Sequence, residues 1–157
     1  MYRLARGGKM SCKVMIVDDD VIIRSLFEKS FCDSCQLVIA AEGATALEMI
    51  KKDKPDLLFL DIDMPGISGM EVLRLLKASG TMPIIWMLTG NEKLEIITEA
   101  INLGAAGYLT KPFDQKKIKE ILDNVLTPEA EKTSARPWSV KRKGGQEPEK
   151  PGQKNQP

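Results

Sequence analysis

Histidine is absent from the 157 residues of this chain. Its absence removes the commonest general base and the usual nitrogen ligand for metals, and it excludes a phosphohistidine formed on the chain itself. A structural zinc site is also disfavoured, because without histidine the three cysteines fall short of the four ligands that such a site normally needs.

Cysteine is scarce, and a secretory hydrophobic segment is missing. The odd number of cysteines, Cys12, Cys32 and Cys35, argues against a disulfide framework, so we expect free thiols and a cytoplasmic location. Cys32 and Cys35 have the spacing of a redox motif. They follow an expected helix instead of preceding one, however, and we interpret them as incidental thiols.

An excess of charge of either sign is also lacking, since 23 Lys and Arg residues balance 22 Asp and Glu residues. This balance gives no reason to expect direct DNA binding or membrane attachment. The segment 136–143 is locally basic around Trp138; we interpret it as a solvated linker, with docking on a partner or an anionic surface as the alternative.

Four hydrophobic runs each lead into reactive polar side chains. If the runs are parallel strands, their carboxyl ends lie at one edge of a sheet, where open α/β folds carry their chemistry. Carboxylates, a hydroxyl and an ammonium at that edge indicate a site for phosphoryl transfer. The runs and the residues that follow them are 14–17 with Asp18, Asp19 and Asp20; 57–60 with Asp61; 84–88 with Thr89; and 108–109 with Lys111 and Pro112.

Apolar periodicity predicts five alternating pairs of strand and helix. Such alternation requires right-handed crossovers, so we expect a flavodoxin-like doubly wound α/β domain with a five-stranded parallel sheet in the order 2-1-3-4-5. The expected strands are 13–17, 36–41, 56–60, 83–88 and 106–109, and the expected helices are 21–27, 44–51, 70–76, 92–103 and 114–126.

Composition also divides the chain into a folded domain and two flanking segments. We place the domain at 12–126 and interpret 1–11 as a disordered lead-in. Residues 127–157 are rich in Pro, Gly, Gln, Lys and Glu, and we expect a disordered tail because they lack the apolar content to fold alone.

The polar groups also match a known pattern. The segments VDDD at 17–20, LDIDMPG at 60–66, LTG at 88–90 and YLTKPF at 108–113 occur in this order. Together they resemble the receiver domains of response regulators in two-component signalling, over about residues 13–126.

The resemblance implies that Asp61 is a phosphoacceptor. Its carboxylate would take a phosphoryl group from the phosphohistidine of a sensor histidine kinase or histidine phosphotransfer protein, and would form an acyl phosphate. Lys111 would neutralise charge, and Pro112, which in the family commonly follows a cis peptide bond, would aim the Lys111 ammonium. The chain would therefore assist its own phosphorylation and dephosphorylation without being an enzyme in the usual sense.

The resemblance also implies a Mg²⁺ site. Asp19 and Asp61 would be direct ligands, Asp18 would act through water, and Asp63 would contribute its backbone carbonyl. Electrostatics supports a cation independently, because crowded carboxylates raise one another's pKa and cost stability unless a cation joins them.

A switch is expected as well. Thr89 would hydrogen-bond the phosphoryl group, and Tyr108 would rotate into the space that the Thr89 loop leaves. The face formed by 92–103, 106–109 and 114–126 would then change its affinity for a downstream target protein, and by analogy with the family we expect a phosphorylation-linked dimer.

Asp63 is individual to this sequence, and we consider it together with Asn91. Each lies two residues after a site residue, and we expect them jointly to set the lifetime of the acyl phosphate, in a direction that the sequence leaves open.

Two alternatives to a stand-alone receiver stay open. Asp61 and Asp63 also resemble the nucleophile and acid of haloacid-dehalogenase-like phosphatases, although in that family the pair follows the first strand. The second alternative to the stand-alone receiver that we expect is a receiver fragment that lacks its output domain.

Overall fold

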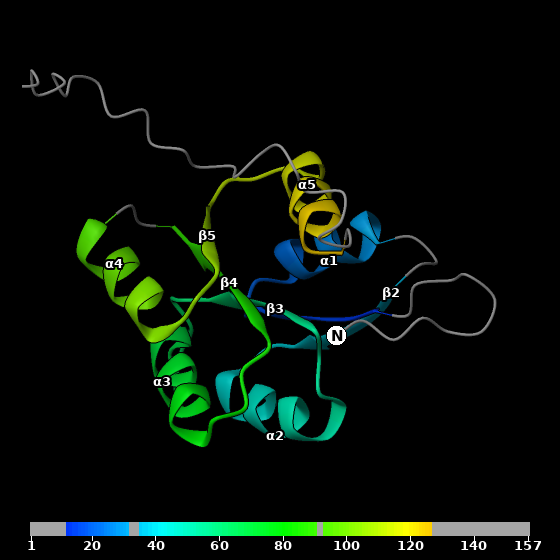
Figure 1. Ribbon diagram of the computed structural model, residues 1–157. Helices are drawn as coiled ribbons and strands as arrows, with labels where there is room; N and C mark the ends of the chain where they lie inside the picture. Colours follow the sequence, from blue (N-terminus) through cyan, green and yellow to red (C-terminus); the bar gives the residue numbers. More distant parts are fainter. Residues whose placement is uncertain (1–11, 32–34, 91–92, 127–157) are drawn as a thin grey trace, which may run out of the picture. The chain divides into compact units, whose positions relative to one another are not determined.

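The computed structural model describes residues 12–31, 35–90 and 93–126. Within these ranges, five strands alternate with five helices, as expected from the sequence (Figure 1). The strands are β1 (Cys12–Val17), β2 (Cys35–Ala40), β3 (Leu57–Asp61), β4 (Ile84–Thr89) and β5 (Gly107–Thr110). The helices are α1 (Val21–Ser30), α2 (Gly43–Asp53), α3 (Gly69–Ser79), α4 (Leu94–Leu103) and α5 (Gln115–Leu126).

The strands form one parallel sheet in the order β2-β1-β3-β4-β5. The predicted flavodoxin-like topology is therefore confirmed. The order reverses between β1 and β3, so the carboxyl ends of these two neighbouring strands flank the crevice in which such folds place their sites.

Helices cover both faces of the sheet, with α1 and α5 on one face and α2, α3 and α4 on the other (Figure 1). β3 illustrates why the strand is apolar from Leu57 to Leu60, before it ends at Asp61. Leu58 and Leu60 belong to the core cluster under α2, α3 and α4, while Leu57 and Phe59 belong to the cluster under α1 and α5. Alternate side chains of a strand point to opposite faces, so a strand covered on both faces carries apolar side chains at successive positions.

Local signals in the sequence set where the helices begin and end. Asp20 is the N-cap of α1 and accepts a hydrogen bond from the Ile22 N–H at 2.7 Å, while Ser68 does the same for the Glu71 N–H of α3 at 3.3 Å. α3 ends at Gly80, whose φ of 73° is a left-handed conformation that glycine adopts without strain.

One expectation about the fold is wrong. A disulfide joins Cys12 at the start of β1 to Cys35 at the start of β2. The count and setting of the cysteines argued against a disulfide, but neither quantity reflects strand register, which places these two residues opposite each other. Cys32 lies outside the described residues.

Two other expectations concern membrane attachment and the domain boundaries, and the described residues address each of them only in part. In the part of the chain that the structure describes, no helix is both long and apolar enough to cross a bilayer. The predicted segments 1–11 and 127–157 lie outside the described residues, so the proposed domain boundaries stay predictions.

Candidate functional site

Two buried carboxylates lie at the reversal point of the sheet. Asp18 follows β1 and Asp61 ends β3, and the register pairs Val17 with Leu60 directly before them. Only 0% of Asp18 and 2% of Asp61 is exposed. Burying an ionised group costs free energy unless a partner of opposite charge or a hydrogen bond compensates it, so we expect such a partner next to these two side chains.

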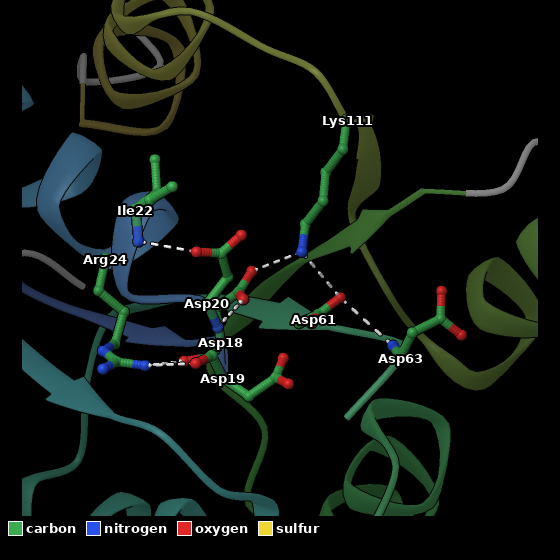
Figure 2. A network of polar contacts seen from close by, with 8 residues as sticks. All are labelled: Asp18, Asp19, Asp20, Ile22, Arg24, Asp61, Asp63 and Lys111. Carbon is green, nitrogen blue, oxygen red and sulfur yellow. Dashed lines mark hydrogen bonds and ion pairs between the residues drawn. The ribbon is translucent and has the colours of Figure 1, made fainter. Parts of the chain in front are cut away.

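Lys111 is that partner among the described residues. It follows β5, two strands away from β3, and its side chain reaches across the carboxyl edge of the sheet (Figure 2). Its Nζ lies 2.8 Å from Asp18 Oδ2 and 3.3 Å from Asp61 Oδ1. The Lys111–Pro112 peptide bond is cis, as the family resemblance implied, and the Lys111 N–H donates to the Thr89 carbonyl at 2.8 Å.

The charges in this cluster change one another's proton affinity. Burial and the neighbouring Asp18 charge raise the pKa of Asp61 from 3.8 to about 6, against the opposing attraction of Lys111. Burial alone would lower the pKa of Lys111, but the Asp18 and Asp61 carboxylates outweigh burial and raise it above its ordinary value. The ammonium is therefore charged at neutral pH, and Asp61 is the group whose ionisation the fold disfavours.

Asp19 adds a third carboxylate to the same corner. One carboxylate oxygen each from Asp18, Asp19 and Asp61 lies within 4.8 Å of the others, with Asp19 exposed to solvent. Three ionised carboxylates against one ammonium leave two negative charges in excess, which matches a divalent cation. An all-oxygen ligand set with an open, solvent-facing side also fits a hard ion such as Mg²⁺, which keeps several of its waters.

Hydrogen bonds hold the loop that carries Asp18 and Asp19. The Asp20 N–H donates to Asp18 Oδ1 at 2.9 Å. Arg24, one turn into α1, donates from one guanidinium nitrogen to the backbone carbonyls of both Asp18 and Asp19, each at 2.9 Å (Figure 2). Sequence reasoning missed Arg24, because its partners are backbone atoms and it appears in the sequence only as an ordinary helical arginine.

Gly69 is the second residue that the sequence did not reveal, and it lies close to the backbone of Asp61. A Cβ on Gly69, the first residue of α3, would lie 2.0 Å from the Asp61 carbonyl oxygen. The Gly69 N–H also donates to the Ile62 carbonyl at 3.1 Å. Glycine therefore lets the start of α3 approach the strand end that carries Asp61, and the available signal was a glycine just after a Ser N-cap.

The remaining predicted residues surround this cluster at different depths. Thr89 is buried at the end of β4, next to the strand that carries Asp61, whereas Tyr108 on β5 is 45% exposed. The Asp63 N–H donates to Asp61 Oδ1 at 3.3 Å, but the Asp63 side chain is exposed and extends away from the cluster (Figure 2). Asn91 lies outside the described residues.

A family model decides what this arrangement is. The model for the response regulator receiver domain matches residues 14–123. The chain belongs to this family. The resemblance of its motifs to receiver domains is thereby confirmed, and so is its membership of a class of phosphoacceptors that are not conventional enzymes.

Individual relatives agree with this assignment. The receiver is 35% identical over 118 residues to sporulation initiation phosphotransferase F of Bacillus subtilis, a match that covers 74% of this chain and 95% of that protein. It is 38% identical over 105 residues to response regulator MprA of Mycobacterium ulcerans, covering 66% of this chain and 45% of MprA. The chain thus spans nearly all of the first relative and less than half of the second.

The solved structures agree in fold. The chemotaxis protein CheY4 of Vibrio cholerae matches with a TM-score of 0.68 and 30% identity, covering 74% of this chain and 99% of that chain. The receiver therefore shares its fold with a family of signalling domains.

Proposed function

We propose that this receiver accepts a phosphoryl group on Asp61 from a sensor histidine kinase or a histidine phosphotransfer protein. The observation that carries the proposal is the pairing of Asp61 with Lys111 at the switch point of the sheet. A phosphohistidine would have to come from another protein, since the chain has no histidine. The Asp61 carboxylate attacks phosphorus, the bond from phosphorus to the donor's imidazole nitrogen breaks, and an acyl phosphate results.

The surrounding residues divide the work of positioning and charge neutralisation. Lys111 lies 3.3 Å from Asp61 Oδ1 and would contact the incoming phosphoryl oxygens. Asp19 and Asp61 would ligate Mg²⁺ directly, Asp18 through water, and Asp63 through its backbone carbonyl. When bound, the ion supplies positive charge that offsets the excess carboxylate charge and the charge of the transferring group. By these means the domain would assist both its phosphorylation and its dephosphorylation.

We further propose that Thr89 and Tyr108 transmit the modification. Thr89 is buried on the strand next to the acceptor, one residue beyond Leu88, the register partner of Asp61. Tyr108 is half-exposed on the neighbouring strand, where it has room to change rotamer. The surface formed by α4, β5 and α5 would then bind a target protein or a second copy of the chain. Such a shift needs contacts that differ between the two states, and the Thr89 hydroxyl provides one.

The relatives suggest how the phosphorylated domain acts on other proteins. The name of the Bacillus subtilis relative describes a phosphotransferase, and the match covers 95% of that protein. We therefore favour a receiver that acts as a single domain by protein contact, or that passes its phosphoryl group to another histidine protein, without direct DNA binding. A cytoplasmic location follows as a proposal, because the kinases' phosphohistidine domains work there.

Asp63 and Asn91 are proposed to tune the lifetime of the acyl phosphate. Asp63 donates its own N–H to the acceptor carboxylate, and its exposed side chain adds a negative charge two residues after Asp61. An Asp63→Asn protein should therefore lose its phosphoryl group at a changed rate, followed by intact mass after removal of the donor. An unchanged rate would exclude this role for Asp63.

The test of the main proposal is labelling with acetyl phosphate and Mg²⁺, read by intact-mass spectrometry. We expect one phosphoryl adduct that disappears in Asp61→Asn and without metal. Asp20→Asn is the matched control, since Asp20 is an exposed carboxylate on the same loop whose capping role asparagine can keep. Labelling that survives in Asp61→Asn would overturn the assignment of the acceptor.

The phosphatase alternative makes a different prediction. Asp61 ends the third strand and Asp63 follows it, and the chain belongs to the receiver family, so neither feature favours a haloacid-dehalogenase-like enzyme. Sustained, Mg²⁺-dependent turnover of a phosphomonoester such as p-nitrophenyl phosphate, lost in Asp63→Asn, would support that enzyme instead. We expect no turnover.

A further inference from the structure

Cys12 and Cys35 face each other across the first two strands of the sheet. Parallel register pairs the two residues directly, and their Cα atoms are 4.8 Å apart. Disulfides typically join residues with Cα separations of about 4.4–6.8 Å, so the backbone of the folded sheet already satisfies this requirement. The pairing therefore follows from β1–β2 register, which the whole domain holds in place.

The pair lies at the far end of the strands from the phosphoacceptor. Cys12 begins β1, and Asp18 follows the end of the same strand, roughly 20 Å farther along at the usual rise per residue. β2 is an edge strand whose neighbour in the sheet is β1, and four of its six residues are only partly buried. A disulfide at this position links the edge strand β2 covalently to β1, its neighbour in the sheet.

The two sulfurs are unequally accessible. Cys12 is 2% exposed and belongs to the core cluster with Phe27 and Leu57, whereas Cys35 is only partly buried at the edge of that cluster. A reagent from solvent therefore meets Cys35 first. Cys12 can react next only with a group that Cys35 brings to it.

We propose that Cys12 and Cys35 form a reversible redox pair that is oxidised by small-molecule disulfides of the glutathione class. The Cys35 thiolate attacks one sulfur of the small disulfide, breaking its S–S bond and releasing one small thiolate. The Cys12 thiolate then attacks the Cys35 sulfur, forms the protein disulfide and releases the second small thiolate. Two electrons pass to the small disulfide, and the two protons from Cys12 and Cys35 end on the released thiols.

Oxidation has a mechanical consequence. The bond closes a loop with a sequence separation of 23 residues, which contains α1 and the acidic loop before it. Closing a loop of this length restricts the unfolded chain and stabilises the folded one. In a reducing compartment the pair rests as two thiols, and oxidation makes the domain more resistant to unfolding.

The test compares the full chain in reduced and oxidised glutathione buffers. After rapid alkylation, mass spectrometry should find the oxidised chain two hydrogen atoms lighter, with peptide mapping that joins Cys12 to Cys35. The loss of two hydrogens should persist in Cys32→Ser and vanish in Cys12→Ser and Cys35→Ser. Trapped at early times, the glutathione adduct should map to Cys35. A link that needs Cys32, no link at all, or an adduct mapping first to Cys12 would overturn the proposal.

A second measurement rests on the unsubstituted chain, which matters because a polar residue at buried Cys12 can impair folding. The oxidised parent chain should melt about 10 °C above the same chain after reduction, from the loop length and the size of the domain. Cys35→Ser is the matched control, and its melting temperature should be the same in both buffers. Equal melting temperatures of the oxidised and reduced parent would refute the proposed stabilisation.

Discussion

Replacing Asp61 with asparagine removes a carboxylate that the fold holds at a cost. Burial and the Asp18 charge raise its pKa from 3.8 to about 6. Above about pH 6 the group is ionised in both the folded and unfolded states, and the full cost reduces stability. Below about pH 3.8 it is protonated in both states and the cost is gone. A difference of about two pKa units corresponds to about 3 kcal/mol.

We therefore expect metal-free Asp61→Asn to be more stable than the parent by about 1 to 3 kcal/mol near pH 8. The upper figure is the net ionisation cost, which already includes the attraction of Lys111, and the lower figure allows for screening by solvent at the open side of the site. The gain should shrink as the pH falls from about 6 to about 4, because the parent then binds a proton at Asp61. Urea unfolding followed by circular dichroism, with a chelator present, measures the difference.

Two comparisons make this prediction refutable. An Asp61→Asn protein no more stable than the parent near pH 8, or a gain of the same size near pH 4, would refute the electrostatic reasoning. Asp20→Asn should lack the pH-dependent gain, because Asp20 is exposed. Adding Mg²⁺ should stabilise the parent more than Asp61→Asn, by about 2.7 kcal/mol at a hundredfold excess over Kd if the variant does not bind.

Four further outcomes follow from the site. Lys111→Ala should slow labelling by acetyl phosphate on the order of 100-fold, since a main positive charge beside Asp61 is lost; an unchanged rate by intact mass would contradict this role. Gly69→Ala should lower stability by about 1–3 kcal/mol through its clash with the Asp61 carbonyl, and an unchanged unfolding midpoint would argue against that clash. Arg24→Ala should weaken Mg²⁺ binding about tenfold in a calorimetric titration, with partial recovery in Arg24→Lys. Equal Mg²⁺ affinities of the parent and Arg24→Ala would show that Arg24 does not support the metal site. Thr89→Ala should keep labelling but lose the phosphorylation-dependent change in hydrogen exchange of β5, whereas Thr89→Ser should keep both, and a full response in Thr89→Ala would exclude the switch.

The fold could be predicted because its signals are local and repeated. Each apolar run is followed by a helix of matching periodicity, and the nearly continuous run that became β3 indicated a strand covered on both faces. The observed ends of the strands and helices differ from the expected ends by a few residues. Asp61, for example, was expected just beyond its strand and instead forms its last residue, because the ladder with β4 continues to Leu88.

The core of the site could be predicted for the same reason. Asp18 and Lys111 directly follow strands and Asp61 ends one, so sheet topology brings all three to one edge. Arg24 and Gly69 could not be found in this way. Arg24 acts on backbone carbonyls, and Gly69 acts by lacking a side chain, so both roles depend on atomic positions that sequence periodicity does not specify.

The disulfide could not be predicted from the number of cysteines, because that number carries no information on strand register. Counting cysteines treats them as a set, whereas bonding depends on which pair the register places together. A strand boundary one residue longer at each start would have put Cys12 and Cys35 within their strands, and the parallel pairing of neighbouring strands would then have suggested the link.

The distribution of the site over the chain has a consequence for signalling in the cell. Asp18 comes from the first strand, Asp61 from the middle of the sequence and Lys111 from beyond the last strand. A nascent, clipped or partly unfolded chain in which either end has not docked therefore lacks the acceptor pocket as a unit. Only completely folded chains would then be phosphorylated at Asp61. Damaged copies would not take part in the response, and no separate quality-control step would be needed to exclude them.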